Sequence, residues 1–293
     1  MSVTLRALVL PAFDDLEGVP SEADPWRRAY EFEHAVDVPG LSAPLQYTSR
    51  GLGLVPTGIG KTAAATTTTA VCASEAVDLD GALVCSVGVA GGPPDLPIGS
   101  VVVADRLLDW DDKCRFDPDE EGSVPIASDP YTDRGAFGFD SELVSQAESL
   151  AEGVTLRPPE ADADDGDQGR QDPADSDSGQ DPEVVTGTNL CGDELWHGRR
   201  LAEEASWLAD EHGCEPHLAT EMEDAGTATA LARFRYADQY LSLRGISNHD
   251  RQSGDEAARE SFFSSGFEAG FETGLENAVA VARAVVDDRL PRR

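Results

Sequence analysis

Short apolar runs rich in β-branched residues, separated by polar stretches, are the most regular pattern along the chain. They occupy residues 5–10, 52–56, 82–89, 99–104 and 239–247. Several of these runs are apolar at nearly every position, which is typical of strands in a sheet that is covered on both faces. We therefore expect them to be strands, and the run nearest the N-terminus to be the first strand.

Two later stretches repeat their apolar residues at helical spacing. Residues 193–212 show this periodicity and end before Gly213, a residue type that often terminates helices. From Glu260 onward, apolar side chains recur at intervals of four and three, at Phe263, Phe267, Phe271, Leu275, Val279, Ala282 and Val286. This spacing predicts one amphipathic helix whose apolar face packs in the core. A second face of the same helix carries Gly266, Gly270 and Gly274. Another backbone could approach that face closely, so we interpret it as a candidate contact of a homo-oligomer.

The alternation of predicted strands and helices is typical of an α/β protein. One segment does not fit this pattern, because residues 158–183 contain ten acidic residues, one Arg and no Val, Ile, Leu or aromatic residue. Such a segment cannot bury enough apolar surface to offset the entropy of ordering it. We predict one domain over residues 1–293, interrupted by a disordered acidic insert at 158–183 that precedes a strand at Val184.

The charge of the chain restricts its partners. With 56 acidic and 22 basic residues, the formal net charge is −34, and Lys61 and Lys113 are the only lysines. A field of this sign repels phosphate backbones and anionic membranes, so we do not expect a nucleic acid partner. Near molar salt the screening length falls to about 3 Å and the self-repulsion fades. The acidic excess therefore predicts a salt-adapted, halophilic protein, although a merely acidic protein is the alternative.

Cysteine usage and hydropathy indicate a cytoplasmic protein. The five cysteines are an odd number without a C-x-x-C pair, so neither a disulfide framework nor a metal site is expected. No run of eighteen apolar residues is present, so we expect no membrane-spanning helix. The apolar run near the N-terminus is short and is interrupted by Pro11, unlike a signal peptide.

A glycine-rich turn follows the second apolar run and contains Gly58, Gly60 and Lys61. Backbone N–H groups at the start of a helix bind anions, so the turn is a candidate anion or ribose site. A Walker A motif would need glycine where Val55 stands, and so it is excluded. A dinucleotide fingerprint ending at Ala63, with Asp78 further on, fits the spacing, as does a plain strand-to-helix turn.

Two other predicted strands end in segments with candidate chemistry. Residues 87–94 are rich in glycine and include Gly91, and residues 244–250 include Asn248 and Asp250. Ligands of α/β proteins bind beyond such strand ends, although an ordinary turn explains both segments equally well.

A further acidic segment precedes a stretch of small residues with helical character. It places Met222 between Glu221 and Glu223, and Asp224 follows. Acidic residues are favoured at a helix N-terminus, so capping explains Asp224. Capping does not explain a methionine between two glutamates.

The order of these four segments resembles the nucleoside phosphorylase superfamily, which includes methylthioadenosine nucleosidases, purine nucleoside phosphorylases and uridine phosphorylases. Within it, the chain most closely resembles the family named purine nucleoside permeases. Further matching features are Trp26, Pro39-Gly40-Leu41 and the segment from Asp193 to Gly198. The resemblance covers almost the whole chain except the acidic insert, and it disfavours the dinucleotide interpretation. It implies a single α/β domain with a mixed, partly closed central sheet flanked by helices, and no cofactor.

The resemblance assigns the sugar to one group of residues. Glu223 is implied to hydrogen-bond the ribose 2′- and 3′-hydroxyls, and Met222 to pack against the sugar. Gly60 and Gly91 are implied to shape the sugar and nucleophile side. A carboxylate that holds the hydroxyls also favours the positive charge that develops on the ribose as the glycosidic bond breaks.

The resemblance assigns the purine to a second group. Asn248 is implied to face purine N7, and Trp196 and His197 lie in the segment near which base-contacting aromatic residues occur. Asn can donate a hydrogen bond but cannot deliver a proton. Asp250, with a raised pKa, is therefore the candidate general acid, unless it is a solvated turn residue.

The nucleophile is left open between phosphate and water. Val89 stands where phosphorylases offer a small hydroxyl residue to the phosphate, and an apolar side chain cannot bind phosphate. Three arginines could compensate: Arg50, Arg134 and Arg244. If water is the nucleophile, Asp14 or Asp15 could activate it, although a solvated loop explains both.

The sequence therefore predicts a protein that binds a purine nucleoside and cleaves its N-glycosidic bond by phosphorolysis or hydrolysis, with inorganic phosphate as a possible co-substrate. The alternative is a non-catalytic nucleoside-binding protein associated with transport, as the family name suggests.

Overall fold

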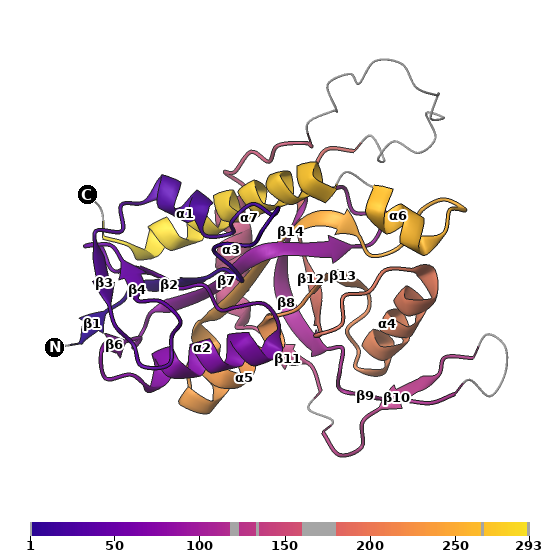
Figure 1. Ribbon diagram of the computed structural model, residues 1–293, viewed down its shortest axis with the longest axis horizontal. Helices are drawn as coiled ribbons and strands as arrows, with labels where there is room; N and C mark the ends of the chain where they lie inside the picture. The colour runs from indigo at the N-terminus through magenta and orange to yellow at the C-terminus, as the bar shows by residue number, and fades with distance from the viewer. Residues whose placement is uncertain (1, 118–122, 133–134, 160–179, 265–266, 292–293) are drawn as a thin grey trace.

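The computed structural model describes residues 2–117, 123–132, 135–159, 180–264 and 267–291, and is built around a ten-stranded mixed sheet (Figure 1). Along the sheet lie β11 (Phe137–Gly138), β8 (Val101–Asp109), β12 (Val184–Cys191), β13 (His217–Glu221), β7 (Leu83–Gly92), β2 (Ala7–Leu10), β5 (Leu52–Leu54), β4 (Leu45–Tyr47) and β3 (His34–Val36). The remaining strand, β14 (Tyr240–His249), pairs with both β7 and β8. Strands β7, β14, β8, β12 and β13 therefore close into a ring, and the partly closed sheet predicted from the resemblance is confirmed.

Helices cover the sheet on two sides (Figure 1). On one side α2 (Lys61–Ala73) packs against α5 (Asp224–Phe234). On the other side lie α1 (Asp24–Ala29), α3 (Ser141–Ala151) and α7 (Phe267–Arg289). Helices α4 (Arg199–Glu211) and α6 (Ala258–Ser264) lie at the far end from the two chain termini. The arrangement is a mixed α/β fold in one domain, as predicted.

Small strand pairs and one short 3-10 helix complete the described structure. Strand β1 (Val3–Thr4) pairs with β6 (Val77–Asp78), and β9 (Lys113–Arg115) pairs with β10 (Ile126–Ser128). The 3-10 helix spans Ala237–Gln239. The run at 5–10, predicted as one strand, forms β2 only from Ala7 onward, because the chain changes partners after β1 from β6 to β5 and β7.

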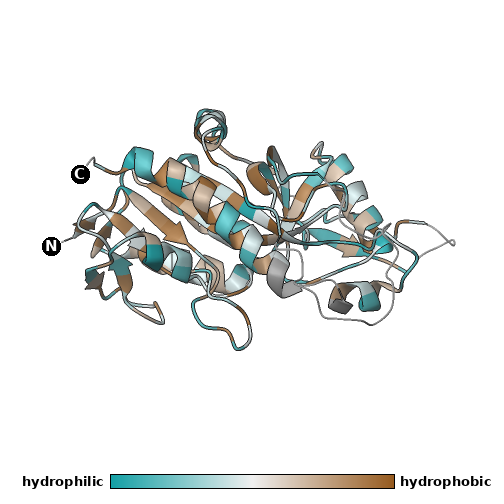
Figure 2. Cartoon of the chain, turned by 90° about the horizontal axis from the view of Figure 1, so that it is seen from above, coloured by the Kyte–Doolittle hydropathy of each residue, from teal (hydrophilic) through white to brown (hydrophobic). Residues whose placement is uncertain are grey.

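The other continuous apolar runs are strands β5, β7, β8 and β14, as predicted, and the last three extend further than the runs do. Their apolar character reflects burial on both faces, since every residue from 83 to 88 of β7 is buried. Figure 2 shows hydrophobic residues concentrated along the sheet between the helices. A second core cluster, between β12 and α4, contains Trp110 and Trp196.

The two predicted helices form with shifted boundaries. The helix predicted at 193–212 begins only at Arg199, because Gly198 has a φ of 144° that ends the preceding turn. The C-terminal stretch forms two helices, α6 and α7, instead of the one predicted. Phe271, Leu275 and Val279 of its apolar face are almost fully buried, while the side chains of Phe263 and Phe267 lie outside the described ones.

The glycine face of α7 packs against the chain itself. A Cβ at Gly274 would lie 2.9 Å from the carbonyl oxygen of Ile246, and one at Gly270 would collide with the carbonyl of Ser247. Close backbone approach was predicted, but the partner is β14 rather than a second subunit, so this face no longer supports an oligomer. A homo-oligomer stays a prediction.

Most of the acidic insert, residues 160–179, lies outside the described residues, while β12 begins at Val184 as predicted. All five cysteines are described and free. Among the described residues, no helix combines the length and the apolar character needed to cross a bilayer.

Candidate functional site

Three strand ends meet where the sheet closes on itself. Gly91 of β7 pairs with Thr220 of β13 on one side and with Asn248 of β14 on the other. A Cβ at position 91 would lie 3.1 Å from Thr220 Cγ2 and 3.3 Å from Asn248 Nδ2. A larger residue would force one of these side chains to shift, so glycine favours the close approach that brings two of the predicted segments together with the strand that leads to Glu221.

The predicted glycine turn lies against the acidic segment. Gly60, at a φ of 90°, donates its backbone N–H to Glu223 Oε1 over 2.9 Å. The next N–H, from Lys61, donates to Asp193 Oδ1 over 2.7 Å. The turn and Glu223 therefore converge as predicted, and carboxylates accept from both N–H groups.

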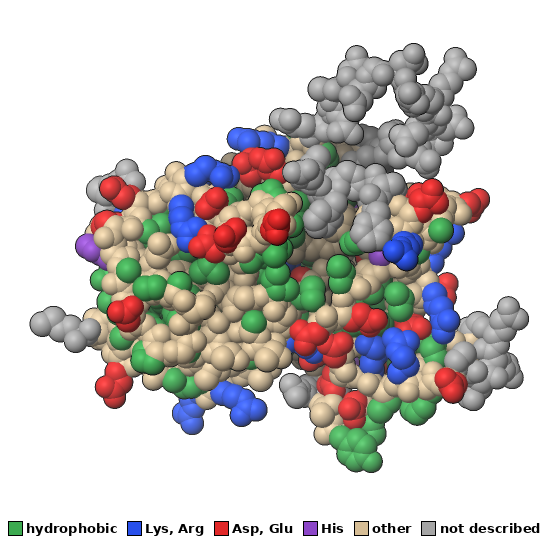
Figure 3. Space-filling model, viewed as in Figure 1, with side chains coloured by type: hydrophobic (Ala, Val, Ile, Leu, Met, Phe, Trp, Pro, Cys, Tyr) green, Lys and Arg blue, Asp and Glu red, His purple; other side chains and the backbone are tan. Residues whose placement is uncertain are grey.

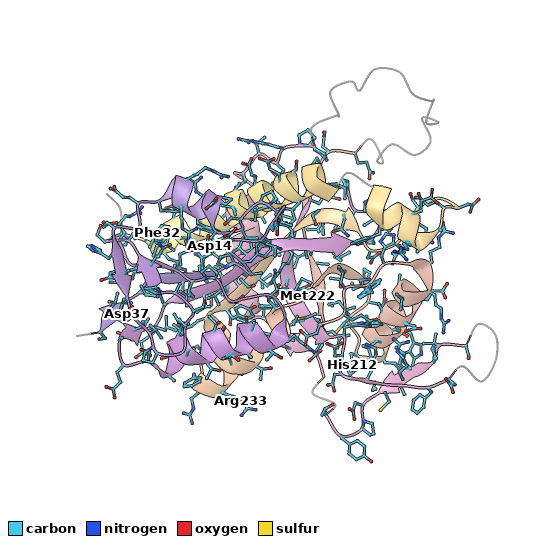
Figure 4. The ribbon with its side chains drawn as sticks, viewed as in Figure 1. Asp14, Phe32, Asp37, His212, Met222 and Arg233 are labelled. Atoms are coloured by element: carbon cyan, nitrogen blue, oxygen red, sulfur yellow. The ribbon has the colours of Figure 1, made fainter. Side chains whose placement is uncertain are left out.

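The acids around Met222 have separate functions. Glu221 Oε2 accepts from the backbone N–H groups of Glu223, at 2.8 Å, and Asp224, at 3.0 Å. Glu221 therefore caps α5, a role that the sequence had suggested for Asp224. The carboxylate of Asp224 instead points into the core, where it accepts from Asn189 Nδ2 over 2.7 Å. Met222 is half-buried at the end of β13 (Figure 4).

One buried guanidinium holds these carboxylates. Arg244, which is 1% exposed, lies 2.8 Å from Glu221 Oε2 and also bonds Asp224 Oδ1 through the same Nη2. Its Nη1 lies 3.7 Å from Glu223 Oε2. A buried cation that bridges several carboxylates fixes their positions, and it has little capacity left for a further anion.

A fourth buried carboxylate, that of Glu22, was not predicted. Glu22 Oε2 accepts from the Ala12 N–H over 2.6 Å, and Oε1 accepts from the Val89 N–H over 3.2 Å. A Cβ at Gly88 would lie 2.6 Å from Glu22 Oε1 and 2.9 Å from Arg244 Nη1, so these two groups face each other across Gly88. The sequence offered no signal for Glu22, since it precedes the short helix α1 among many other acidic residues.

Asp14 and Asp15, the acids predicted to activate water, are exposed. The Asp14 carboxylate is bound by Arg27, whose Nη2 lies 2.7 Å from Oδ2, and this hydrogen bond lowers the pKa of Asp14. In Figure 4, Asp14 and Met222 lie well apart. The buried carboxylate beside Arg244 is therefore that of Glu22, and not that of Asp14 or Asp15.

Burial sets the protonation of this cluster. It raises the pKa of Glu223 to about 7, with further contributions from the charges of Glu22 and Asp224. Burial also raises the pKa of Glu221 to about 8 and raises the pKa of Glu22. Burial opposes the ionisation of Asp224 as well, but the charge and hydrogen bond of Arg244, together with hydrogen bonds from Ser242 and Ser86, outweigh it and lower the pKa of Asp224. The cluster therefore binds protons near neutral pH and can exchange them.

Asn248 and Asp250 lie at and just beyond the end of β14. Asn248 Nδ2 donates to the carbonyl of His249 over 3.1 Å, and its Oδ1 accepts from Ser247 Oγ over 2.9 Å. Asp250 is buried rather than solvated, and its Oδ2 lies 3.1 Å from His217 Nε2.

The segment predicted to contact the base reaches the end of β14. His197 Nδ1 lies 3.0 Å from the carbonyl oxygen of His249. Trp196 is buried and its ring centroid lies 5.8 Å from that of Trp110, so it packs in the second core cluster. Leu195, 70% exposed, is the accessible apolar side chain of this segment.

One of the three arginines proposed to bind phosphate, Arg50, is bound elsewhere in the chain. Arg50 donates to the carbonyl of Pro291 near the C-terminus, and Arg134 lies outside the described residues. Arg244 is at the site but is surrounded by carboxylates. In the part of the chain that the structure describes, no group of three His, Cys, Asp or Glu side chains is arranged to bind a metal ion.

Comparison with protein families assigns the chain to a family. The sequence model of one family, described as purine nucleoside permease (NUP), matches residues 4–291. The chain belongs to the purine nucleoside permease family. A purine nucleoside permease of Candida albicans is 24% identical over 268 residues, which cover 83% of this chain and 66% of that protein.

This permease family member is also similar to nucleosidases. A 5′-methylthioadenosine/S-adenosylhomocysteine nucleosidase of Mycobacterium tuberculosis is 31% identical over 167 residues, which are 55% of this chain and 56% of that protein. The chain therefore spans just over half of the mycobacterial relative and about two thirds of the Candida relative.

Solved structures share the fold over nearly the full length. A 5′-methylthioadenosine/S-adenosylhomocysteine nucleosidase of Colwellia psychrerythraea in complex with adenine has a TM-score of 0.64 at 20% identity, covering 100% of this chain and 98% of that one. The futalosine hydrolase of Helicobacter pylori has a TM-score of 0.61 at 19% identity, covering 97% and 98%. The family member thus has the fold of these nucleosidases.

Proposed function

We propose that the protein binds a purine nucleoside at this strand-end site and hydrolyses its N-glycosidic bond, with water as the nucleophile. The observation that carries the proposal is the set of four buried carboxylates, Glu22, Glu221, Glu223 and Asp224, around the single cation of Arg244.

A phosphate co-substrate would meet an unfavourable environment here. Binding a phosphate requires N–H donors and positive charge. The N–H groups of Ala12 and Val89 donate to Glu22, and that of Gly60 donates to Glu223. Phosphate would also be repelled by the carboxylates themselves. Water, by contrast, can donate a proton to a carboxylate, so the same arrangement suits hydrolysis.

Glu22 is the residue that best fits the activation of water. It is buried, two backbone donors fix its orientation, and burial raises its pKa toward the range in which a carboxylate accepts a proton efficiently. Glu223 is held by Gly60 on the neighbouring side and is placed to accept hydrogen bonds from the ribose hydroxyls. Negative charge on both carboxylates stabilises the positive charge that develops on the ribose in the transition state.

Asn248 stabilises the departing purine in this proposal. Its Nδ2, beside Gly91, can donate a hydrogen bond to purine N7 in place of the His249 carbonyl. The departing purine also needs a proton, which Asn248 cannot supply. Asp250 as general acid stays a prediction, and its contact with His217 connects it to a side chain that can carry a proton.

The comparisons support this proposal and also favour a second candidate. The solved neighbours and the mycobacterial relative carry the name nucleosidase or hydrolase. The Candida relative carries the name permease, which favours nucleoside binding associated with transport. A cytoplasmic location and the absence of a cofactor remain part of the proposal.

A product analysis separates the candidates. The purified protein in molar salt is incubated with inosine, guanosine, adenosine and 5′-methylthioadenosine, and the products are identified by chromatography. We expect free purine and the free sugar in phosphate-free buffer. A sugar 1-phosphate as the product would show a phosphorylase. Binding of a nucleoside without release of base would leave the transport-associated binding protein.

A further inference from the structure

Lys61 occupies a half-buried position between two carboxylates at the edge of the site. Its Nζ lies 2.6 Å from Asp109 Oδ1 and 2.7 Å from Asp111 Oδ2, and its side chain is 17% exposed. Burial opposes the charged form, but the hydrogen bonds to the two aspartates outweigh it and raise the pKa of Lys61. The ammonium is therefore fully charged and neutralised in place.

The contacts of Lys61 join three segments that are distant in the sequence. Asp109 ends β8, and Asp111 lies in the turn that follows. Asp111 Oδ2 accepts from the Asp193 N–H over 2.8 Å, and Asp193 Oδ1 accepts in turn from the Lys61 N–H over 2.7 Å. These hydrogen bonds form a closed circuit that fixes the glycine turn to the ends of β8 and β12. Figure 3 shows acidic and basic side chains side by side on the lower right of the visible face.

The turn held in this way also determines the position of Glu223. The N–H of Gly60, adjacent to Lys61, donates to Glu223 Oε1 over 2.9 Å. The Lys61 carbonyl lies against Gly226 in the first turn of α5, so closely that a Cβ there would collide with it. A shift of Lys61 would therefore move both the donor to Glu223 and the helix that follows Glu223.

Lysine is a rare residue in this chain. The chain has 22 basic residues, and all except Lys61 and Lys113 are arginine. The ammonium is a compact point charge on a flexible stem, and at position 61 its single nitrogen contacts both aspartates. One of the two lysines therefore stands where a single nitrogen bridges Asp109 and Asp111.

We propose that Lys61 is a positioning residue that, by bridging Asp109 and Asp111, holds the Gly60 N–H against Glu223 and so sets the carboxylate that binds the ribose hydroxyls. This inference rests on the proposed nucleoside site. Removal of the ammonium leaves two half-buried aspartates that repel each other, which loosens the turn. The consequence is specific, because only ligands with ribose hydroxyls depend on Glu223.

The test measures binding with ligands that cannot be cleaved. Purine C-nucleosides such as 9-deazainosine and 9-deazaadenosine have a carbon–carbon glycosidic bond, and their N7–H would donate to Asn248 Oδ1 instead of accepting from its Nδ2. Each is compared by calorimetry with its 2′,3′-dideoxy analogue. For Lys61→Met we expect the Kd of the ribonucleoside to rise about tenfold, or more, and that of the dideoxy analogue to stay within twofold. Lys61→Arg should show an intermediate effect. Glu223→Gln should show the same selectivity, and adding Lys61→Met to it should have little further effect.

Two further variants serve as controls for Lys61→Met. Arg157→Met removes an exposed ion pair with Glu276, 2.8 Å long, and should change neither Kd. If Lys61→Met does not fold, Asp111→Asn removes one arm of the bridge and should give the same selective loss, smaller in size. An equal rise for both ligands, or no change in either variant, overturns the inference. A wild-type protein that binds neither C-nucleoside overturns the proposed function itself, and the inference with it.

Discussion

Replacement of Glu22 by glutamine tests the proposed chemistry at one atom. Glu22→Gln keeps the size of the side chain but removes the carboxylate that would accept a proton from water. Removal of a general base typically slows the chemical step by about 10²–10⁴-fold, equivalent to about 3–5 kcal/mol in the barrier. We expect kcat to fall by that factor.

The structure also predicts the cost to stability. Glu22 accepts from the Ala12 N–H at 2.6 Å and the Val89 N–H at 3.2 Å, one to each oxygen. Glutamine offers one acceptor and places its NH₂ against the other donor, which leaves a buried donor unsatisfied at a cost of about 1–3 kcal/mol. Glu204→Gln is the matched control, because Glu204 is equally buried and pairs with Arg115 at 2.7 Å, outside the site.

The assay follows base release by chromatography and the Kd of 9-deazainosine by calorimetry, in molar salt. Glu22→Gln should lose kcat while its Kd stays within a few-fold, and Glu204→Gln should keep kcat even if it melts at a lower temperature. The exposed acid offers a further comparison, since Asp14→Asn should keep kcat. A Glu22→Gln protein that turns over within about threefold of wild type would refute the role of Glu22.

Two further predictions rest on the same contacts, and a third rests on the net charge of the chain. Burial raises the pKa of Glu223 to about 7 and that of Glu221 to about 8. The folded state therefore retains protons that the unfolded chain releases near pH 4.5. The stability that these protons provide is present at low pH and is lost as the pH rises through the pKa values of the folded state. Urea titrations should show the free energy of unfolding falling between pH 5 and 9, with a slope of about 1.4 kcal/mol per pH unit for each proton that the folded state retains. Glu223→Gln should flatten this curve. A free energy of unfolding that rises over this pH range would contradict the prediction. Gly88→Ala places a methyl group 2.6 Å from Glu22 Oε1 and should lower kcat/KM by about 100-fold. Gly138→Ala is the control, because its methyl group meets nothing within 4 Å, and it should keep kcat/KM. Equal activity of the two variants would count against the placement of Glu22 at the site. The net charge of −34 predicts a Tm that rises steeply with salt and unfolding on dialysis to low salt, and a Tm indifferent to salt would exclude the halophilic interpretation.

The central strands could be predicted because their burial leaves a continuous apolar run. Strands β7, β8 and β14 are covered on both faces, so each carries apolar residues on both faces, and this pattern predicts a buried strand. The start of α4 at Arg199 could not be predicted, because helical periodicity continues through a turn that ends at Gly198. The partner of the α7 glycines was equally hidden, since spacing reveals a small-residue face but not what covers it.

The site could be predicted in part for a similar reason. Glu223, Gly60, Gly91 and Asn248 belong to local segments of unusual composition. Gly60 donates to Glu223, and Gly91 pairs with Asn248 at the sheet closure. Glu22 belongs to no such segment. Its position depends on contacts with Val89 and Gly88, distant in the sequence, and one acid among 56 carries no local signal of them.

The dependence of base release on phosphate tests the central claim most directly. The initial rate of purine release from the preferred nucleoside is measured in molar sodium chloride as phosphate is varied from zero to tens of millimolar, with the sugar product identified at each point. We predict a rate that is finite without phosphate, does not increase with phosphate, and gives free sugar throughout. A rate that vanishes without phosphate and rises with it, with a sugar 1-phosphate as product, would contradict a site in which carboxylates occupy the anion-binding N–H groups.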